Sequence, residues 1–166
     1  MKPSITRILV PMDFSAQSDL ALQYAMELSG RLGASLHLLH VVEQPLVPAS
    51  WSAEIYVPDL AALEAGLIAE AERLLTINRT LAEGQHLKVE TSVVTGPAAT
   101  TIIGVADNVG ADLIVMGTHG RTGLSHLFMG SVAERVVRLA PCPVLTVRDT
   151  VRKADRPAAR TAQQVA

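Results

Sequence analysis

Glycines are concentrated in one stretch of the chain, between an apolar run and a segment with helical periodicity. Gly117, Gly120, Gly123 and Gly130 lie within one short stretch, and Ser131 follows the last of them. Because glycine has no Cβ and adopts a positive φ at little cost, such a loop can bring backbone N–H groups close to an anion. The N-terminus of the following helix would add unsatisfied N–H groups and a favourable dipole. We therefore expect this loop to bind phosphate.

Three side chains of the same loop could also contact an anion, namely His119, Arg121 and His126. A structural alternative explains part of the pattern, because Ser131 and Glu134 have the spacing of a capping box, in which both side chains satisfy backbone donors at a helix start. A cap accounts for Ser131 but not for the glycines before it. The chain has no P-loop, H-E-x-x-H or G-x-S-x-G motif, and no G-x-G-x-x-G follows its first apolar run.

Short apolar runs alternate with helical patterns along the chain. The runs predict five strands, at residues 5–12, 35–42, 88–95, 112–117 and 143–148. Apolar residues at helical spacing, among them Leu20, Tyr24, Leu28 and Leu32, predict four helices, over residues 15–31, 60–83, 102–109 and 132–139. This alternation is typical of an α/β fold with a parallel sheet and helices on both faces.

The polarity of the strands predicts their order in the sheet. Residues 88–95 include charged side chains, as an exposed edge strand does, whereas residues 5–12 and 112–117 are apolar enough to be central and covered on both faces. With right-handed crossovers, the order 3-2-1-4-5 in chain numbering fits best. We therefore expect a single-domain, open five-stranded parallel sheet. Its switch point would bring Asp13 and Gly117 together at one crevice, where such sheets bind ligands.

Composition excludes several classes of function. The 166 residues are 49% hydrophobic and 18% charged, with a formal net charge of −2, so we expect one compact domain over residues 1–148 without nucleic-acid or membrane partners. The N-terminal apolar run is too short for a signal peptide, which predicts a cytoplasmic location. Residues 149–166 lack an apolar period and predict a disordered tail.

Cys142 is the only cysteine, which rules out an intrachain disulfide and predicts a small buried residue. His37 and His40 fall on opposite faces of one strand, so they cannot share a metal ion.

At the glycine loop the chain resembles the universal stress protein family, whose ATP-binding members carry the pattern G-x2-G-x9-G-[ST]. Gly117, Gly120, Gly130 and Ser131 match that pattern. The resemblance extends over residues 5–148, through "ILVPMDFS", "ADLIVMGTHGRTG" and "GSVAERVVRLAPCPVLTV". It implies a Rossmann-like sheet of the adenine nucleotide alpha hydrolase type. Phe14 departs from the pattern, because many members have glycine there.

The resemblance also implies how ATP would be bound. Asp13 would contact the ribose or adenosine end, and Val41 would offer backbone contacts to adenine. The other residues implied in the cofactor site are Pro11 and Met116 at the base, and Gly117, Gly120, Gly130, Ser131 and Val132 around the ribose and phosphates. Arg121, in the same loop, joins the candidate site by its charge. From the residues alone, Pro11, Val41 and Met116 could instead be strand-end packing, and Asp13 could be a helix N-cap.

Three functions remain open for such a site. The first is a nucleotide-dependent regulator of the stress response with at most slow ATP hydrolysis, because no carboxylate lies between Gly117 and Ser131 to orient a water molecule. Mg²⁺ or Mn²⁺ would then be held by phosphate oxygens and water, with no protein metal site and no catalytic residue. The second is an ATPase or autophosphorylating phosphotransferase, and the third is a protein-interaction module with an empty pocket. The resemblance further implies a homodimer formed through residues 143–148, an apolar strand with an unpaired edge.

Overall fold

Strands and helices alternate along the part of the chain that the computed structural model describes, which comprises residues 4–43, 59–119 and 129–148. The elements, in order, are β1 (Arg7–Pro11), α1 (Ala16–Leu32), β2 (Ser35–Val42), α2 (Leu60–Glu83), β3 (Val89–Thr95), α3 (Ala98–Asn108), β4 (Leu113–Gly117), α4 (Ser131–Leu139) and β5 (Val144–Val147). All predicted elements are present. The first strand is shorter than predicted, because it begins at Arg7 and ends at Pro11, which has no N–H for a ladder.

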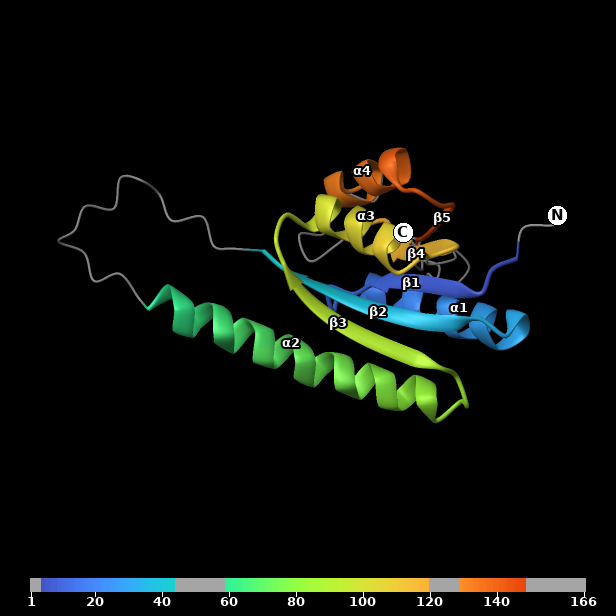
Figure 1. Ribbon diagram of the computed structural model, residues 1–166, viewed down its shortest axis with the longest axis horizontal. Coiled ribbons are helices and arrows are strands. Elements are labelled where there is room, and N and C mark those ends of the chain that lie inside the picture. Colours follow the sequence, from blue (N-terminus) through green and yellow to red (C-terminus); the bar gives the residue numbers. More distant parts are fainter. Residues whose placement is uncertain (1–3, 44–58, 120–128, 149–166) are drawn as a thin grey trace, which may run out of the picture.

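The five strands form one parallel sheet in the order β3-β2-β1-β4-β5, as predicted. Figure 1 shows α1 and α2 on one face of the sheet and α3 and α4 on the other. The charged strand β3 lies at one edge and β5 at the other. The direction of travel through the sheet therefore reverses between β1 and β4, at the carboxyl ends of the two central strands.

Side chains of the central strands alternate between two apolar layers. Ile8 and Val10 of β1 pack into the layer beneath α1 and α2, whereas Leu9 packs into the layer beneath α3 and α4. In β4, Val115 packs into the layer beneath α1 and α2, and Ile114 packs into the layer beneath α3 and α4. All five side chains are fully buried. The prediction that β1 and β4 are covered on both faces is confirmed. Their carboxyl ends form the base of the crevice.

The ends of α1 follow from its sequence. Ser15 is the N-cap, and its hydroxyl oxygen accepts a hydrogen bond from the Ser18 N–H at 3.3 Å. Gly33 is the C-cap with a φ of 68°, a left-handed conformation that favours glycine. Because α1 starts directly after the turn that follows β1, the turn residues Asp13 and Phe14 are fixed at both ends.

Only part of the apolar pattern that predicts the helices meets the sheet. In α1, Tyr24 and Leu32 are about half exposed, whereas the buried apolar residues are Ala21, Leu22, Ala25 and Met26. In α2, the exposed leucines are Leu60, Leu63, Leu67 and Leu81. The buried face of each helix is therefore displaced from the stripe of large residues that predicts it. No helix of the described residues is long and apolar enough to cross a membrane.

Candidate functional site

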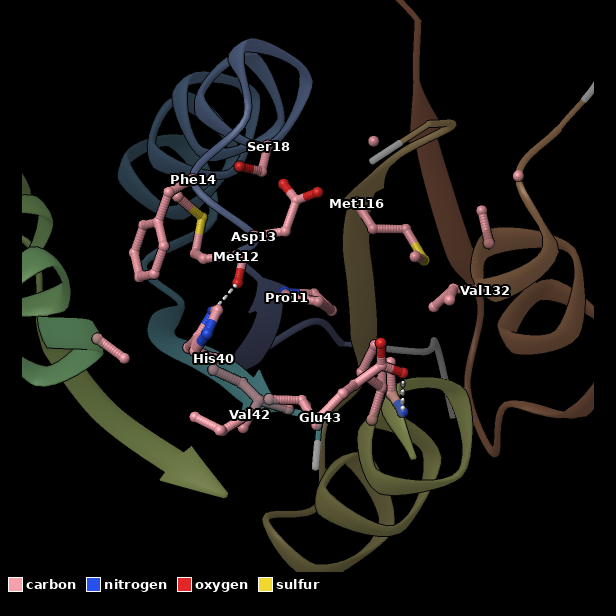
Figure 2. A pocket seen from close by; sticks show the side chains of 18 of the residues that line it. Pro11, Met12, Asp13, Phe14, Ser18, His40, Val42, Glu43, Met116 and Val132 are labelled. Carbon is pink, nitrogen blue, oxygen red and sulfur yellow. Dashed lines mark hydrogen bonds between the residues drawn. The ribbon is translucent and has the colours of Figure 1, made fainter. Parts of the chain in front are cut away.

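A cavity of about 630 Å³ opens at the carboxyl ends of β1, β2 and β4. Figure 2 shows that Asp13, Met116 and Val132 reach it from three different elements. The predicted site residues that line it are Pro11, Asp13, Val41, Met116, Gly117, Gly130, Ser131 and Val132. Gly120 and Arg121 lie outside the described residues. The fold thus brings together residues that are far apart in the sequence, at the switch point of the sheet.

The turn after β1 presents Asp13 to the cavity. Its Oδ1 accepts hydrogen bonds from the Ser15 N–H at 3.1 Å and from the Ser15 hydroxyl at 2.6 Å. The alternative that Asp13 caps α1 is wrong, because Ser15 occupies the N-cap position. Asp13 instead accepts hydrogen bonds from the N-cap residue Ser15, and Asp13 is among the residues that line the cavity.

Two cavity residues that the sequence does not assign to the site, Phe14 and His40, stand beside Asp13. The rings of Phe14 and His40 are stacked, with centroids 4.7 Å apart and an interplanar angle of 26° (Figure 2). Phe14 has a φ of 60°, which is rare for a bulky residue. Sequence spacing carries no signal for this pair, because the two residues come from different elements and meet only in the fold.

The carboxyl end of β4 is tied to the start of α4. The Gly130 N–H donates to the Thr118 carbonyl oxygen at 2.8 Å, which joins the two ends of the glycine loop. A Cβ on Gly117 would lie 3.0 Å from the Cβ of Gln17 in α1. A Cβ on Gly130 would lie 3.2 Å from the Thr118 carbonyl oxygen. Both glycines are therefore favoured by the close approach of neighbouring chain, which would have to shift by a few tenths of an ångström to admit a Cβ.

The start of α4 differs from the capping-box alternative. Gly130 is the N-cap, and no side-chain hydrogen bond caps the helix in the described residues. Ser131 is the first helical residue and is exposed, so Ser131 and Glu134 do not form the expected reciprocal cap. The capping-box interpretation is wrong. The first N–H groups of α4 consequently face the cavity end of the sheet without a side-chain acceptor, which suits an anion.

His119 adds an unsatisfied polar atom to the cavity wall. Its Nδ1 lies 3.0 Å from the Thr118 hydroxyl oxygen, but its buried Nε2 has no hydrogen-bond partner in the described structure. A buried polar nitrogen without a partner is costly unless a ligand or water satisfies it. His119 was noted as a possible anion contact in the loop but not assigned to the cofactor site, and its position between two loop glycines was the only sequence signal.

The carboxylates around the cavity already have partners. Glu43 Oε1 accepts from the Ala98 N–H at 3.1 Å and so caps α3, whose N-cap residue is Pro97. Glu70, from α2, forms an ion pair with Arg73 at 2.7 Å, and the hydrogen bond from Arg73 lowers the pKa of Glu70. Both carboxylates therefore serve structural roles.

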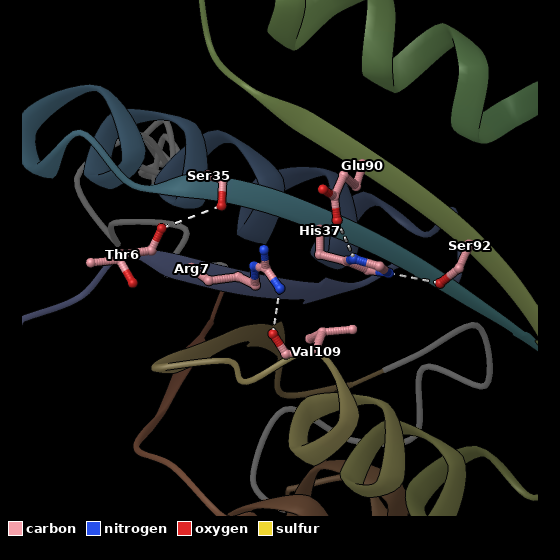
Figure 3. Close-up of polar contacts among 7 residues, drawn as sticks. All are labelled: Thr6, Arg7, Ser35, His37, Glu90, Ser92 and Val109. Carbon is pink, nitrogen blue, oxygen red and sulfur yellow. Dashed lines mark hydrogen bonds and ion pairs between the residues drawn. The ribbon is translucent and has the colours of Figure 1, made fainter.

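His37 and His40 lie on opposite faces of β2, as predicted. His37 Nε2 is 2.8 Å from the Ser92 hydroxyl, and its Nδ1 is 3.5 Å from Glu90, away from the cavity (Figure 3). Burial lowers the pKa of His37, against the raising effect of Glu90. Among the described residues, no three His, Cys, Asp or Glu side chains are placed to hold a metal ion.

Cys142 is half-buried at the edge of the layer beneath α3 and α4. Burial raises the pKa of its thiol, so the reactive thiolate is disfavoured. This agrees with the interpretation of Cys142 as a packing residue.

Comparison with known proteins places this fold and cavity in a family. The sequence model of the Universal stress protein family matches residues 4–148. The universal stress protein MJ0531 of Methanocaldococcus jannaschii is 37% identical over 145 residues, which cover 86% of this chain and 81% of that protein. The solved structure of MJ0577, from the same organism, has a TM-score of 0.76 and 30% identity, covering 89% of this chain and 98% of that one.

Two more distant structures share the fold. One is a universal stress protein in complex with cAMP, at a TM-score of 0.65 and 24% identity, covering 87% of this chain and 97% of that one. The other is a universal stress protein from Archaeoglobus fulgidus in complex with dAMP, at a TM-score of 0.59 and 20% identity, covering 87% of this chain and 98% of that one. Because the family model matches residues 4–148, a range that includes all of the described residues, and MJ0531 is 37% identical, the chain belongs to the universal stress protein family.

Proposed function

We propose that this protein binds an adenine nucleotide, ATP, in the cavity at the β1/β4 switch point and acts in the cytoplasm as a nucleotide-dependent regulator of the stress response. One observation carries the proposal: α4 begins at Gly130 without a side-chain cap, and Gly130, Ser131 and Val132 line the cavity. Uncapped N–H groups at the start of a helix are what a phosphate would satisfy.

The phosphates would lie at the start of α4. The N–H groups of Ser131 and Val132 and the Ser131 hydroxyl would donate to phosphate oxygens, because both residues line the cavity at the uncapped start of α4. Gly120 and Arg121 would complete this end from the loop.

The nucleoside would extend from β4 across β1 to β2. Those strands are neighbours in the sheet, so the span is about 10 Å at the usual strand spacing. Pro11, Val41 and Met116 would line the base, and the Asp13 carboxylate would accept hydrogen bonds from the ribose hydroxyls. The cavity volume of about 630 Å³ lies in the usual range for small-molecule sites.

Turnover of ATP would be slow. Hydrolysis needs a group that orients water at the γ-phosphate, together with stabilisation of the transferring phosphoryl group. Of the carboxylates that line the described cavity, Asp13 is assigned to the ribose, Glu43 caps α3 and Glu70 pairs with Arg73. Mg²⁺ or Mn²⁺ would be held by the phosphates and water. The nucleotide complexes of the two distant relatives agree with an adenine nucleotide ligand.

The binding test is calorimetric titration of nucleotide-free protein with Mg·ATP, for the wild type and for Ser131→Glu. A carboxylate in the first turn of α4 favours the helix dipole but repels phosphate, so we expect micromolar binding by the wild type and at least tenfold weaker binding by the variant, with an unchanged circular dichroism spectrum. Thr100→Glu is the matched control, because Thr100 is exposed in the first turn of α3 and does not line the cavity.

Each result has a definite meaning. Wild-type protein that binds no ATP would overturn the nucleotide proposal and favour the interaction module. Equal affinity of wild type and Ser131→Glu would show that the phosphates lie elsewhere. Phosphate release from ATP under single-turnover conditions distinguishes the enzymatic alternative: we expect bound ATP to persist over minutes, and rapid metal-dependent release of ADP would identify an ATPase.

A further inference from the structure

The turn between β1 and α1 holds a bulky residue in an unfavourable backbone conformation. Phe14 has a φ of 60°, and in the described structure only one other non-glycine residue, His86, has a positive φ. L-residues with a Cβ avoid this region, and such outliers persist where the surrounding structure over-determines them. His86 lies in the exposed connection after α2, whereas Phe14 lines the cavity. The conformation of Phe14 therefore calls for a local cause at the site.

His40, on the neighbouring strand β2, contacts Phe14 and its turn. Its ring stacks on the Phe14 ring with centroids 4.7 Å apart, and its Nδ1 lies 2.7 Å from the Met12 carbonyl oxygen. Because a carbonyl oxygen only accepts, Nδ1 carries the proton and donates. The Met12 N–H in turn donates to the Leu39 carbonyl oxygen at 2.7 Å. One side chain of β2 thus holds the residues on both sides of Asp13.

Asp13 is consequently fixed between two anchored neighbours. Its carboxylate is oriented from the other side by the N–H and hydroxyl of Ser15. Figure 2 shows the stacked rings of Phe14 and His40 next to Asp13, on the side of the cavity away from Met116 and Val132. A rotation of the turn, which loss of the stack would permit, would move the Asp13 carboxylate relative to the rest of the cavity.

We propose that Phe14 and His40 are positioning residues that set the preference of this site for ribose over deoxyribose. This inference rests on the proposed function, in which Asp13 accepts hydrogen bonds from the ribose hydroxyls. Such bonds weaken steeply when their distance or angle departs from the ideal, so a small displacement of the carboxylate removes the discrimination between ATP and 2′-deoxy-ATP. The phosphates are held by α4, on another element, and do not depend on this turn.

The experiment measures the affinities of full-length protein for ATP, ADP and 2′-deoxy-ATP by calorimetry in four proteins. Phe14→Gly removes the ring and tolerates the positive φ, so the turn is free of backbone strain. His40→Gln removes the stack. His86→Gly is the matched control, because it relieves the other positive φ outside the cavity. We expect wild type and His86→Gly to prefer ATP to 2′-deoxy-ATP by at least fivefold, and both cavity variants to lose that preference.

The ratio of affinities for ATP and ADP is the internal control, and it should stay within twofold in all four proteins. A wild-type preference for ribose that survives in Phe14→Gly and His40→Gln would overturn the inference while leaving the nucleotide site intact. Equal wild-type affinities for ATP and 2′-deoxy-ATP would also overturn the inference, because Asp13 would then not distinguish ribose from deoxyribose. Absence of any ATP binding by the wild type is the separate result that refutes the proposed function itself.

Discussion

Gly117 and Gly130 show why a residue type can be predicted correctly for an incomplete reason. The sequence pattern favours glycine for its freedom to adopt a positive φ, yet neither of these two has one. A Cβ would instead meet Gln17 at the first position and the Thr118 carbonyl oxygen at the second. Close approach of α1 at Gly117, and of the Thr118 backbone at Gly130, therefore favours glycine at these positions, and a single sequence contains no direct record of such approaches.

Other residues of the site differ in how far the sequence could assign them. Pro11 and Met116 are visible as the limits of apolar runs, but only the family resemblance assigned them to the site, and both line the cavity. Phe14, His40 and His119 could not be assigned, since a ring stack, a strained φ and an unpartnered buried nitrogen exist only in the folded chain.

His37 predicts a pH dependence of stability. Burial holds the pKa of His37 in the folded chain below the usual 6.5. At a pH between the lowered pKa and 6.5, the imidazole is therefore protonated in the unfolded chain and neutral in the folded chain. The free energy of unfolding should therefore be highest above pH 6.5 and fall as the pH drops through 6.5 towards the lowered pKa. Glu90 opposes the shift, and Arg7 adds to it.

Urea denaturation at pH 7.5 and pH 5.0 measures this effect, with His37→Gln as the comparison because glutamine is neutral and can still bond Ser92. The wild type should lose more stability on acidification than the variant. An equal loss in both proteins would mean that His37 does not titrate across this range.

At the scale of elements, the capping-box interpretation of α4 failed because the pattern is shared by two arrangements. Ser131 fits an N-cap by type, but the chain turns one residue earlier, at Gly130, whose N–H is held by Thr118. The exposed leucines of α1 and α2 illustrate a similar ambiguity. Helical spacing predicts that a helix is present, but it does not determine which face meets the sheet, and in α1 that face holds Ala21, Leu22 and Ala25.

Strand β5 carries a prediction about assembly. It pairs with β4 on one side and forms the edge of the sheet on the other, and Leu145 is 38% exposed. We propose that two copies pair through this edge, because an apolar edge with unpaired backbone groups favours association. Light scattering should give the mass of a dimer for the wild type and of a monomer for Leu145→Asp.

Leu63→Asp is the control for that measurement, since Leu63 is similarly exposed but lies in α2, which packs against β2 and β3 at the other edge of the sheet. It should remain dimeric. A monomeric wild type, or a Leu145→Asp variant that stays dimeric, would place the assembly surface elsewhere or remove it.

At the scale of the whole molecule, the strand order was predicted correctly because it depends on coarse features. The alternation of strands and helices sets a parallel sheet, and the polarity of β3 marks an edge, so few topologies remain once crossovers are right-handed. Side-chain contacts within the cavity depend on distances of a few tenths of an ångström, which these features do not determine.

Nucleotide binding should stabilise the whole domain. A ligand at 100 times its dissociation constant adds about 2.7 kcal/mol to the free energy of unfolding, and Tm rises by about 2–4 °C per kcal/mol for a domain of this size. Differential scanning calorimetry should therefore show an increase of roughly 5–10 °C with saturating Mg·ATP. Ser131→Glu at the same ATP concentration should show a much smaller increase, and an equal one would argue against a phosphate site at α4.

An amide ¹H–¹⁵N NMR titration with Mg·ATP would report directly where the nucleotide lies. We expect the amide signals of Asp13, Thr118 and Ser131, at the carboxyl end of the sheet, to shift together along one saturating curve. Thr6 and Asp112, which hydrogen-bond each other at the opposite end, should stay unchanged. Shifts concentrated around Thr6 and Asp112, or no shifts at millimolar ATP, would contradict a nucleotide site at the β1/β4 switch point.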